Sequence, residues 1–151
     1  MPLATEGLPS TASFDNVHLV LQSAENRAQV IKDTAAIATF VINNKDKSIT
    51  ASYTVDFKNE GTVKLGEYEG KEEDVDITLY LSDESFNDLA TDKTSAKWLI
   101  FTGKLKTKGS ILKGRTVEAA LKWARGKHEE LIKNGGGVDA GAAATAVPAT
   151  V

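Results

Sequence analysis

The segment Gly109-Ser-Ile-Leu-Lys-Gly-Arg-Thr116 comes close to the glycine-rich loop that holds nucleotide phosphates. Arg115 stands where that loop needs its lysine, and the residues between the two glycines include good helix formers. Ser110 is suited to cap a helix that starts there. A turn from a strand into a helix, with glycine for backbone freedom, therefore explains the segment better than nucleotide hydrolysis.

A second segment, 128–132, reads His-Glu-Glu-Leu-Ile and begins like the helix of a zinc protease. Ile132 stands where the second histidine ligand would be, and the chain has no cysteine and one other histidine, His18. No Gly-x-Ser-x-Gly elbow accompanies these histidines, and the acid pair Glu72 and Glu73 lies in a loop that we expect to be solvated. We expect neither a catalytic centre nor a metal or cofactor.

Hydrophobic periodicity predicts the elements that carry these segments. In chain order they are helices over 14–24 and 25–34, strands over 37–42, 53–58, 62–65 and 75–82, a short helix carrying Phe86, Leu89 and Ala90, a helix over 94–101, a strand over 104–108, and a helix over 111–133. The four successive strands predict an antiparallel meander, which the fifth strand joins after a helical crossover. The fold class is α+β, with a five-stranded, mostly antiparallel sheet covered on one face by about five helices.

The 151 residues are enough for one domain, with 41% hydrophobic and 26% charged residues. We expect a flexible lead-in over 1–13, the domain over 14–133, and a disordered Gly/Ala-rich tail over 134–151. No apolar run reaches the roughly 20 residues of a membrane span. The net charge of −3 argues against a nucleic-acid partner and, with modest apolar surface, favours a monomer.

The charge is unevenly distributed, because residues 93–133 hold eleven Lys and Arg against three acids. One interpretation is the solvated faces of a late strand and helix. The other is a basic face for anionic lipid headgroups, including transient contact with an anionic membrane surface. Likewise, the many apolar faces predict either a filled core or a hollow between sheet and helices, and periodicity does not distinguish the two.

Residues 31–125 resemble the sterol carrier protein type 2 domain, a lipid-binding family. The resemblance rests on Ile37-Ala-Thr-Phe-Val-Ile42, Tyr53-Thr-Val-Asp-Phe-Lys-Asn59, Asp76-Ile-Thr-Leu-Tyr-Leu-Ser-Asp83, and Gly103-Lys-Leu-Lys106 followed by Gly109. It implies a hydrophobic tunnel between sheet and helices that carries fatty acids, fatty acyl-CoA, sterols or phospholipids without catalysis. The lipid is then cargo rather than cofactor.

The residues that we expect to line the tunnel or its mouth are Phe40, Ile42, Val55, Ile77, Leu79, Phe86, Leu89, Trp98, Phe101, Leu112, Val117 and Leu121. The alternative is a non-catalytic accessory module with a filled core that serves a partner enzyme or membrane surface. The lack of cysteine favours an intracellular protein. The chain ends Ala-Thr-Val rather than in a Ser-Lys-Leu-type tripeptide, so we expect the cytoplasm first, with the peroxisome as the alternative.

Overall fold

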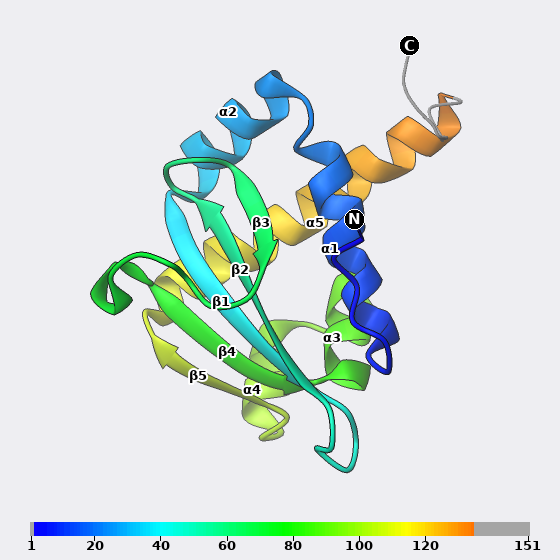
Figure 1. Cartoon of the computed structure of the whole chain (residues 1–151), viewed down its shortest axis with the longest axis vertical. Helices are drawn as coiled ribbons and strands as arrows, with labels where there is room; N and C mark the ends of the chain where they lie inside the picture. The colour runs from blue at the N-terminus through cyan, green and yellow to red at the C-terminus, as the bar shows by residue number, and fades with distance from the viewer. Residues whose placement is uncertain (1, 135–151) are drawn as a thin grey trace.

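The five alternating segments form one sheet in the computed structural model, which describes residues 2–134 (Figure 1). The strands are β1 (Ala36–Asn43), β2 (Thr50–Phe57), β3 (Thr62–Leu65), β4 (Ile77–Ser82) and β5 (Leu105–Gly109). The α-helices are α1 (Ala12–Val20), α2 (Ala24–Thr34), α3 (Asp83–Ala90), α4 (Ala96–Phe101) and α5 (Ile111–Lys133). Short 3-10 helices, η1 (Pro9–Thr11) and η2 (Glu72–Asp74), complete the order. The predicted α+β class is confirmed.

The strand order is β3-β2-β1-β4-β5, and this corrects the predicted meander. β1, β2 and β3 form an antiparallel meander, but β4 pairs in parallel with β1 on its other side. The prediction of four meandering strands was wrong because alternation specifies which face of a strand is buried, not which strand lies beside it. β5 then pairs antiparallel with β4 and becomes the edge strand.

The connection over 66–76 between β3 and β4 crosses the face of the sheet that the helices leave open (Figure 1). Tyr68 of this connection borders a hollow with Thr39 and Val41 of β1. The Thr54 hydroxyl donates to the Gly66 carbonyl oxygen at 2.8 Å, so the connection is tied to β2. This cover explains why β1 is buried on both faces.

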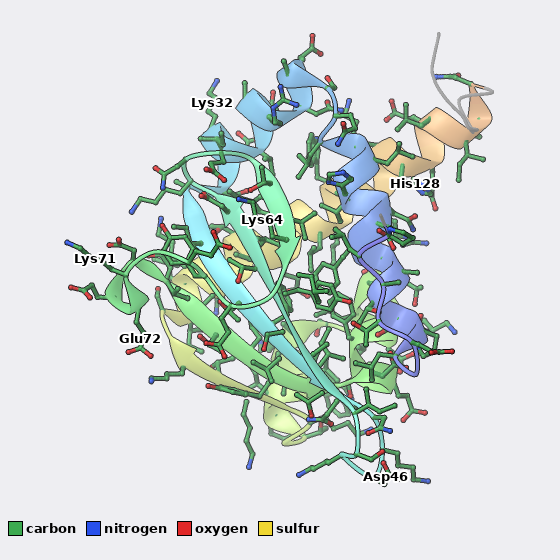
Figure 2. All side chains as sticks on the ribbon, viewed as in Figure 1. Lys32, Asp46, Lys64, Lys71, Glu72 and His128 are labelled. Atoms are coloured by element: carbon green, nitrogen blue, oxygen red, sulfur yellow. The ribbon has the colours of Figure 1, made fainter. Side chains whose placement is uncertain are left out.

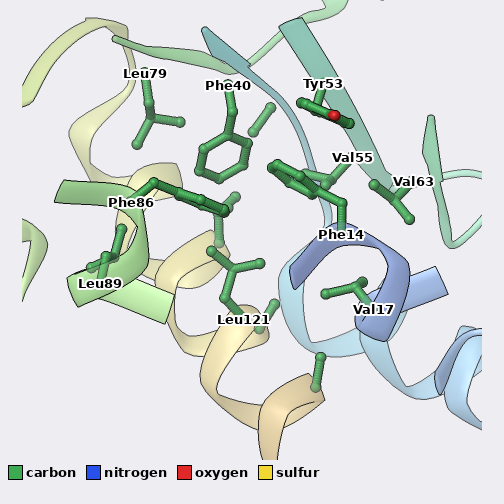
Figure 3. Close-up of a cluster of buried hydrophobic side chains, with 14 of the residues drawn as sticks. Phe14, Val17, Phe40, Tyr53, Val55, Val63, Leu79, Phe86, Leu89 and Leu121 are labelled. Carbon is green, nitrogen blue, oxygen red and sulfur yellow. The ribbon is translucent and has the colours of Figure 1, made fainter. Parts of the chain in front are cut away.

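Four aromatic rings fill the space between the middle of the sheet and the helices (Figure 3). Phe14 of α1 stacks on Tyr53 of β2 and on Phe86 of α3, with ring centroids 4.2 and 4.9 Å apart. Phe40 of β1 meets Phe14 and Phe86 edge-on. All four side chains are fully buried, and each offset or edge contact adds about 0.5–1.5 kcal/mol to the stabilisation from burial.

The segment before α1 packs on this core. Leu8 is fully buried, and the Tyr53 hydroxyl donates to the Leu3 carbonyl oxygen. The Ser10 amide and hydroxyl both donate to Oδ1 of Asp83, at 2.8 and 2.6 Å, which joins η1 to the start of α3. The sequence predicted a flexible lead-in here. The predicted tail lies outside the described residues from position 135 onward.

Serine side chains fix where four helices begin. Ser23, Ser82, Ser95 and Ser110 each accept a hydrogen bond from the backbone N–H three residues later. Such caps contribute about 1 kcal/mol each. The predicted cap at Ser110 is confirmed, and the predicted bounds of α5 agree with the structure.

Gly109 and Gly103 both have positive φ angles, +114° and +78°, but their surroundings differ. A Cβ at position 109 would overlap the Asp76 carbonyl oxygen and lie 3.0 Å from Cα of Ile77, whereas a Cβ at 103 would meet nothing within 4 Å. We expect Gly109→Ala to lower the free energy of unfolding by about 3 kcal/mol or more, because strain and backbone overlap combine. The control Gly103→Ala carries strain alone and should cost about 1 kcal/mol.

Equilibrium urea unfolding of both variants measures these values. Equal losses at the two positions would contradict the close approach of the end of β5 to β4.

Candidate functional site

A pocket of about 680 Å³ lies between the β4–β5 edge of the sheet and the helices α4 and α5. Its lining is mainly apolar. It consists of Ile77 and Leu79 from β4, Leu105 and Thr107 from β5, Ala96, Lys97 and Ile100 from α4, and Ile111, Gly114, Arg115 and Glu118 from α5. The volume falls within the roughly 300–1,000 Å³ that small-molecule sites occupy.

The sheet wall of the pocket follows from strand alternation. Ile77 and Leu79 on β4, with Leu105 and Thr107 on β5, point to the helix-covered side. Leu79 pairs with Thr107, so a small side chain stands opposite a large one at the edge of the sheet. This small residue leaves space that an aliphatic or aromatic residue would fill.

α5 carries a glycine on the helix wall of the pocket, where it approaches β4 closely. A Cβ built on Gly114 would lie 2.8 Å from Cδ1 of Ile77, which is closer than real side chains pack. A glycine in a helix interior costs about 0.5–1 kcal/mol relative to alanine. Here the missing side chain lets Ile77 of β4 pack against α5 at the wall of the pocket.

Three charged side chains also line the pocket. Oε2 of Glu118 accepts a hydrogen bond from the Ala96 amide at 2.9 Å, so this carboxylate occupies the N-terminus of α4 and ties α4 to α5. Lys97 and Arg115 are exposed, and neither forms an ion pair within residues 2–134. Apolar walls with two free cations can hold a long apolar molecule that ends in an anionic group.

The twelve predicted lining residues separate into three groups. Ile77 and Leu79 line the pocket. Trp98, Phe101 and Leu112 are exposed and lie outside it. The remaining seven lie in the buried core, outside the pocket, and are Phe40, Ile42, Val55, Phe86, Leu89, Val117 and Leu121.

Several residues that line the pocket were not among those predicted from the sequence. Leu105 and Thr107 share one face of the predicted strand over 104–108, so alternation alone identifies them as neighbours. Gly114 inside a predicted helix was a signal for a close approach of two elements. Lys97 and Arg115 carried no comparable signal, because lysine and arginine are common on solvated helix faces.

Two smaller hollows border other parts of α5. One, of about 260 Å³, lies against α1 and α3 and includes Phe86, Leu121 and His128, whose pKa is lowered by burial against a smaller opposing effect of Glu129. The other, of about 400 Å³, lies against α2 and includes Leu112. Phe86 of the packed aromatic core lines the first hollow, and this hollow shares no lining residue with the pocket.

The segments that resembled catalytic motifs have ordinary structural roles. Gly109 ends β5 and the residues from Ile111 onward are helical, so the segment 109–116 is the predicted strand-to-helix turn. Segment 128–132 belongs to α5, and Glu72 lies on an exposed turn of the crossing connection (Figure 2). Among residues 2–134, no helix is long and apolar enough to cross a membrane.

The sequence is similar to a known protein family and to several of its members. The model of the SCP-2 sterol transfer family matches residues 17–122. A protein from Yarrowia lipolytica named fatty acid-binding protein is 38% identical over 128 residues, covering 83% of this chain and 98% of its own. The oleate-induced peroxisomal protein POX18 of Candida maltosa is 28% identical, covering 81% of this chain and 94% of its own.

A solved structure supports the same relationship. The apo form of sterol carrier protein 2 from Yarrowia lipolytica superposes with a TM-score of 0.73 at 36% identity, covering 83% of this chain and 98% of that one. Residues 17–122 of the family match include all five strands and α4, in agreement with the resemblance found in residues 31–125. The chain therefore belongs to the SCP-2 sterol transfer family.

Proposed function

We propose that this protein is a non-catalytic lipid carrier that holds the apolar part of its cargo in the pocket between α4, α5 and the β4–β5 edge. Fatty acids and fatty acyl-CoA are the preferred cargo, with the carboxylate or phosphates beside Lys97 and Arg115. The observation that carries the proposal is an apolar pocket with two cations that have no ion-pair partner in the described residues.

Burial of the acyl chain supplies enough free energy for this role. Each methylene removed from water contributes about 0.8 kcal/mol, so a chain of about sixteen carbons gains at most ~13 kcal/mol before ordering costs. Because methylenes distinguish poorly between apolar molecules, we expect broad specificity that extends to sterols and phospholipids. The name of the Yarrowia lipolytica relative supports the fatty-acid class.

We further propose that the carrier is monomeric and works inside the cell. The sequence favoured the cytoplasm, and the Candida maltosa relative, named as a peroxisomal protein, adds the peroxisome as a second setting.

A second candidate is the accessory module with a filled core, which serves a partner enzyme or membrane surface. The observation in its favour is the fully buried cluster of Phe14, Phe40, Tyr53 and Phe86, which occupies the middle of the space where the tunnel was expected. Native mass spectrometry of protein purified from cells separates the two candidates. A co-purifying lipid supports the carrier, and a ligand-free protein that also fails to bind added fatty acid supports the module.

Blocking the pocket tests its role directly. We expect Gly114→Leu to weaken the binding of a fluorescent fatty acid by about tenfold or more, because the new side chain occupies space that several methylenes would fill. The matched control is Gly126→Leu on the same helix, where an added Cβ meets nothing within 4 Å. This control should bind with unchanged affinity.

Circular dichroism and thermal unfolding establish that both variants are folded. Unchanged affinity in a folded Gly114→Leu protein would contradict the assignment of this pocket.

The two cations that line the pocket, Lys97 and Arg115, should recognise the anionic end of the cargo. We expect the double variant Lys97→Gln/Arg115→Gln to bind a fatty acid about three- to tenfold more weakly, because exposed charge pairs contribute little individually. A fatty alcohol of the same length should bind as before. Lys122→Gln is the control, since Lys122 lies outside the pocket and pairs with Asp92 at 3.2 Å.

Competition of each ligand against a fluorescent fatty acid gives the affinities. Parallel losses for acid and alcohol would show that the cations do not recognise the anionic group.

A further inference from the structure

Helix α4 presents two aromatic rings to solvent on the side opposite its anchor. Leu99 is buried, whereas the side chains of Trp98 and Phe101 are 56% and 80% exposed. Their ring centroids lie 5.6 Å apart, so the two rings form one apolar surface. Because Ala96, Lys97 and Ile100 face the pocket, α4 separates the pocket from this aromatic pair.

Leaving large apolar side chains such as these in contact with water is unfavourable in free energy. Isolated exposed apolar residues are normal, but a Trp and a Phe in contact on one short helix are typical of a docking surface. Within residues 2–134 the pair contributes nothing to the buried core. Stability of the domain therefore does not explain these residues.

The stretch of sequence that carries the pair has charges of one sign. The sequence from 93 to 117 contains no Asp or Glu and seven cations, which are Lys93, Lys97, Lys104, Lys106, Lys108, Lys113 and Arg115. The Lys104 amide donates to the Leu99 carbonyl oxygen at 2.8 Å, so Lys104 lies at the end of α4. The flanking acids have partners, because Asp92 pairs with Lys122 and Glu118 accepts from the Ala96 amide.

We propose that the α4 surface, formed by Trp98, Phe101 and Lys104, docks on an anionic lipid bilayer. Tryptophan rings settle at the headgroup level of a membrane, and lysines near the surface are attracted to anionic headgroups. Lys97 and Ile100 of the same helix line the pocket, so docking through α4 brings the pocket close to the bilayer. Loading from that bilayer rests on the proposed carrier function, whereas docking itself does not.

The size of the surface favours a bilayer over a protein. Each aromatic side chain can bury about 150–250 Å², so two bury at most about 500 Å². A stable protein interface takes about 800 Å² from each partner. A bilayer needs no such area, because inserted rings and surrounding lysines act together at an interface without fixed shape.

The experiment uses the full chain and vesicles of phosphatidylcholine with or without phosphatidylserine. The chain has two tryptophans, and Trp123→Phe leaves Trp98 as the single reporter. We expect its emission to shift to shorter wavelength with phosphatidylserine vesicles and much less with phosphatidylcholine alone. Unchanged emission with both vesicles would overturn the proposal.

Cosedimentation with the same anionic vesicles measures each contribution. We expect Trp98→Ser/Phe101→Ser to lower the partition coefficient by about tenfold or more, and Lys104→Glu by about tenfold. One control is Leu65→Ser, a 55% exposed apolar residue on β3, at the opposite edge of the sheet. The other is Lys32→Glu on α2, at the end of the molecule away from α4 (Figures 1 and 2).

If the partition coefficient on anionic vesicles falls as much in the controls as in the α4 variants, the proposal is overturned. A fall in oligomeric mass on Trp98→Ser/Phe101→Ser, measured by sedimentation velocity, would instead make this surface an interface between copies of the chain. Binding of a fluorescent fatty acid without vesicles tests the carrier function separately. We expect it to be unchanged in the α4 variants, and its absence in the parent protein would refute the carrier while leaving docking intact.

Discussion

The pocket depends on how α5 covers the sheet. Five strands spaced about 4.8 Å apart are roughly twice as wide as one helix, whose diameter with side chains is about 10–12 Å. α5 packs on β1 and β4, while α1 and α2 contact β3 and β2, the two strands at the other edge of the sheet. The β4–β5 edge therefore receives only the first turns of α5 and the six residues of α4. Incomplete cover at this edge makes the pocket.

Side-chain volume decides which half of the space is filled. Under β1 and β2, three Phe rings and a Tyr pack in contact, and a fully buried Leu8 from the N-terminal segment joins them. Under β4 and β5 the corresponding positions include Thr107, Ala96 and Gly114. The sheet has the same alternation throughout, so the difference comes from residue size. A packed half gives the domain its stability and allows the other half to stay open.

The sequence predicted the elements far better than their arrangement. Periodicity located the helices and strands, and Ser110 marked the start of α5, because these signals are local. The position of β4 beside β1 was not predictable from alternation, since its register with β1 is specified only by packing of the assembled sheet. The same limit applies to the site. Phe40 and Val55 share the buried face with Ile77 and Leu79, but whether that face borders packed rings or free space depends on distant residues such as Phe14 and Gly114.

The weakest part of the pocket wall is α4. This helix has one buried side chain, Leu99, and is fixed at its start by the Ser95 cap and by Glu118. Elements with few buried contacts open at lower free energy than the core, so the wall that carries Lys97 is also the wall that opens first. Glu118 belongs both to the lining of the pocket and to the attachment of α4. A molecule that enters the pocket therefore contacts the group that holds its wall in place, whereas the aromatic core on the far side stays packed. The least anchored wall of the pocket is thus the helix that also carries Trp98 and Phe101.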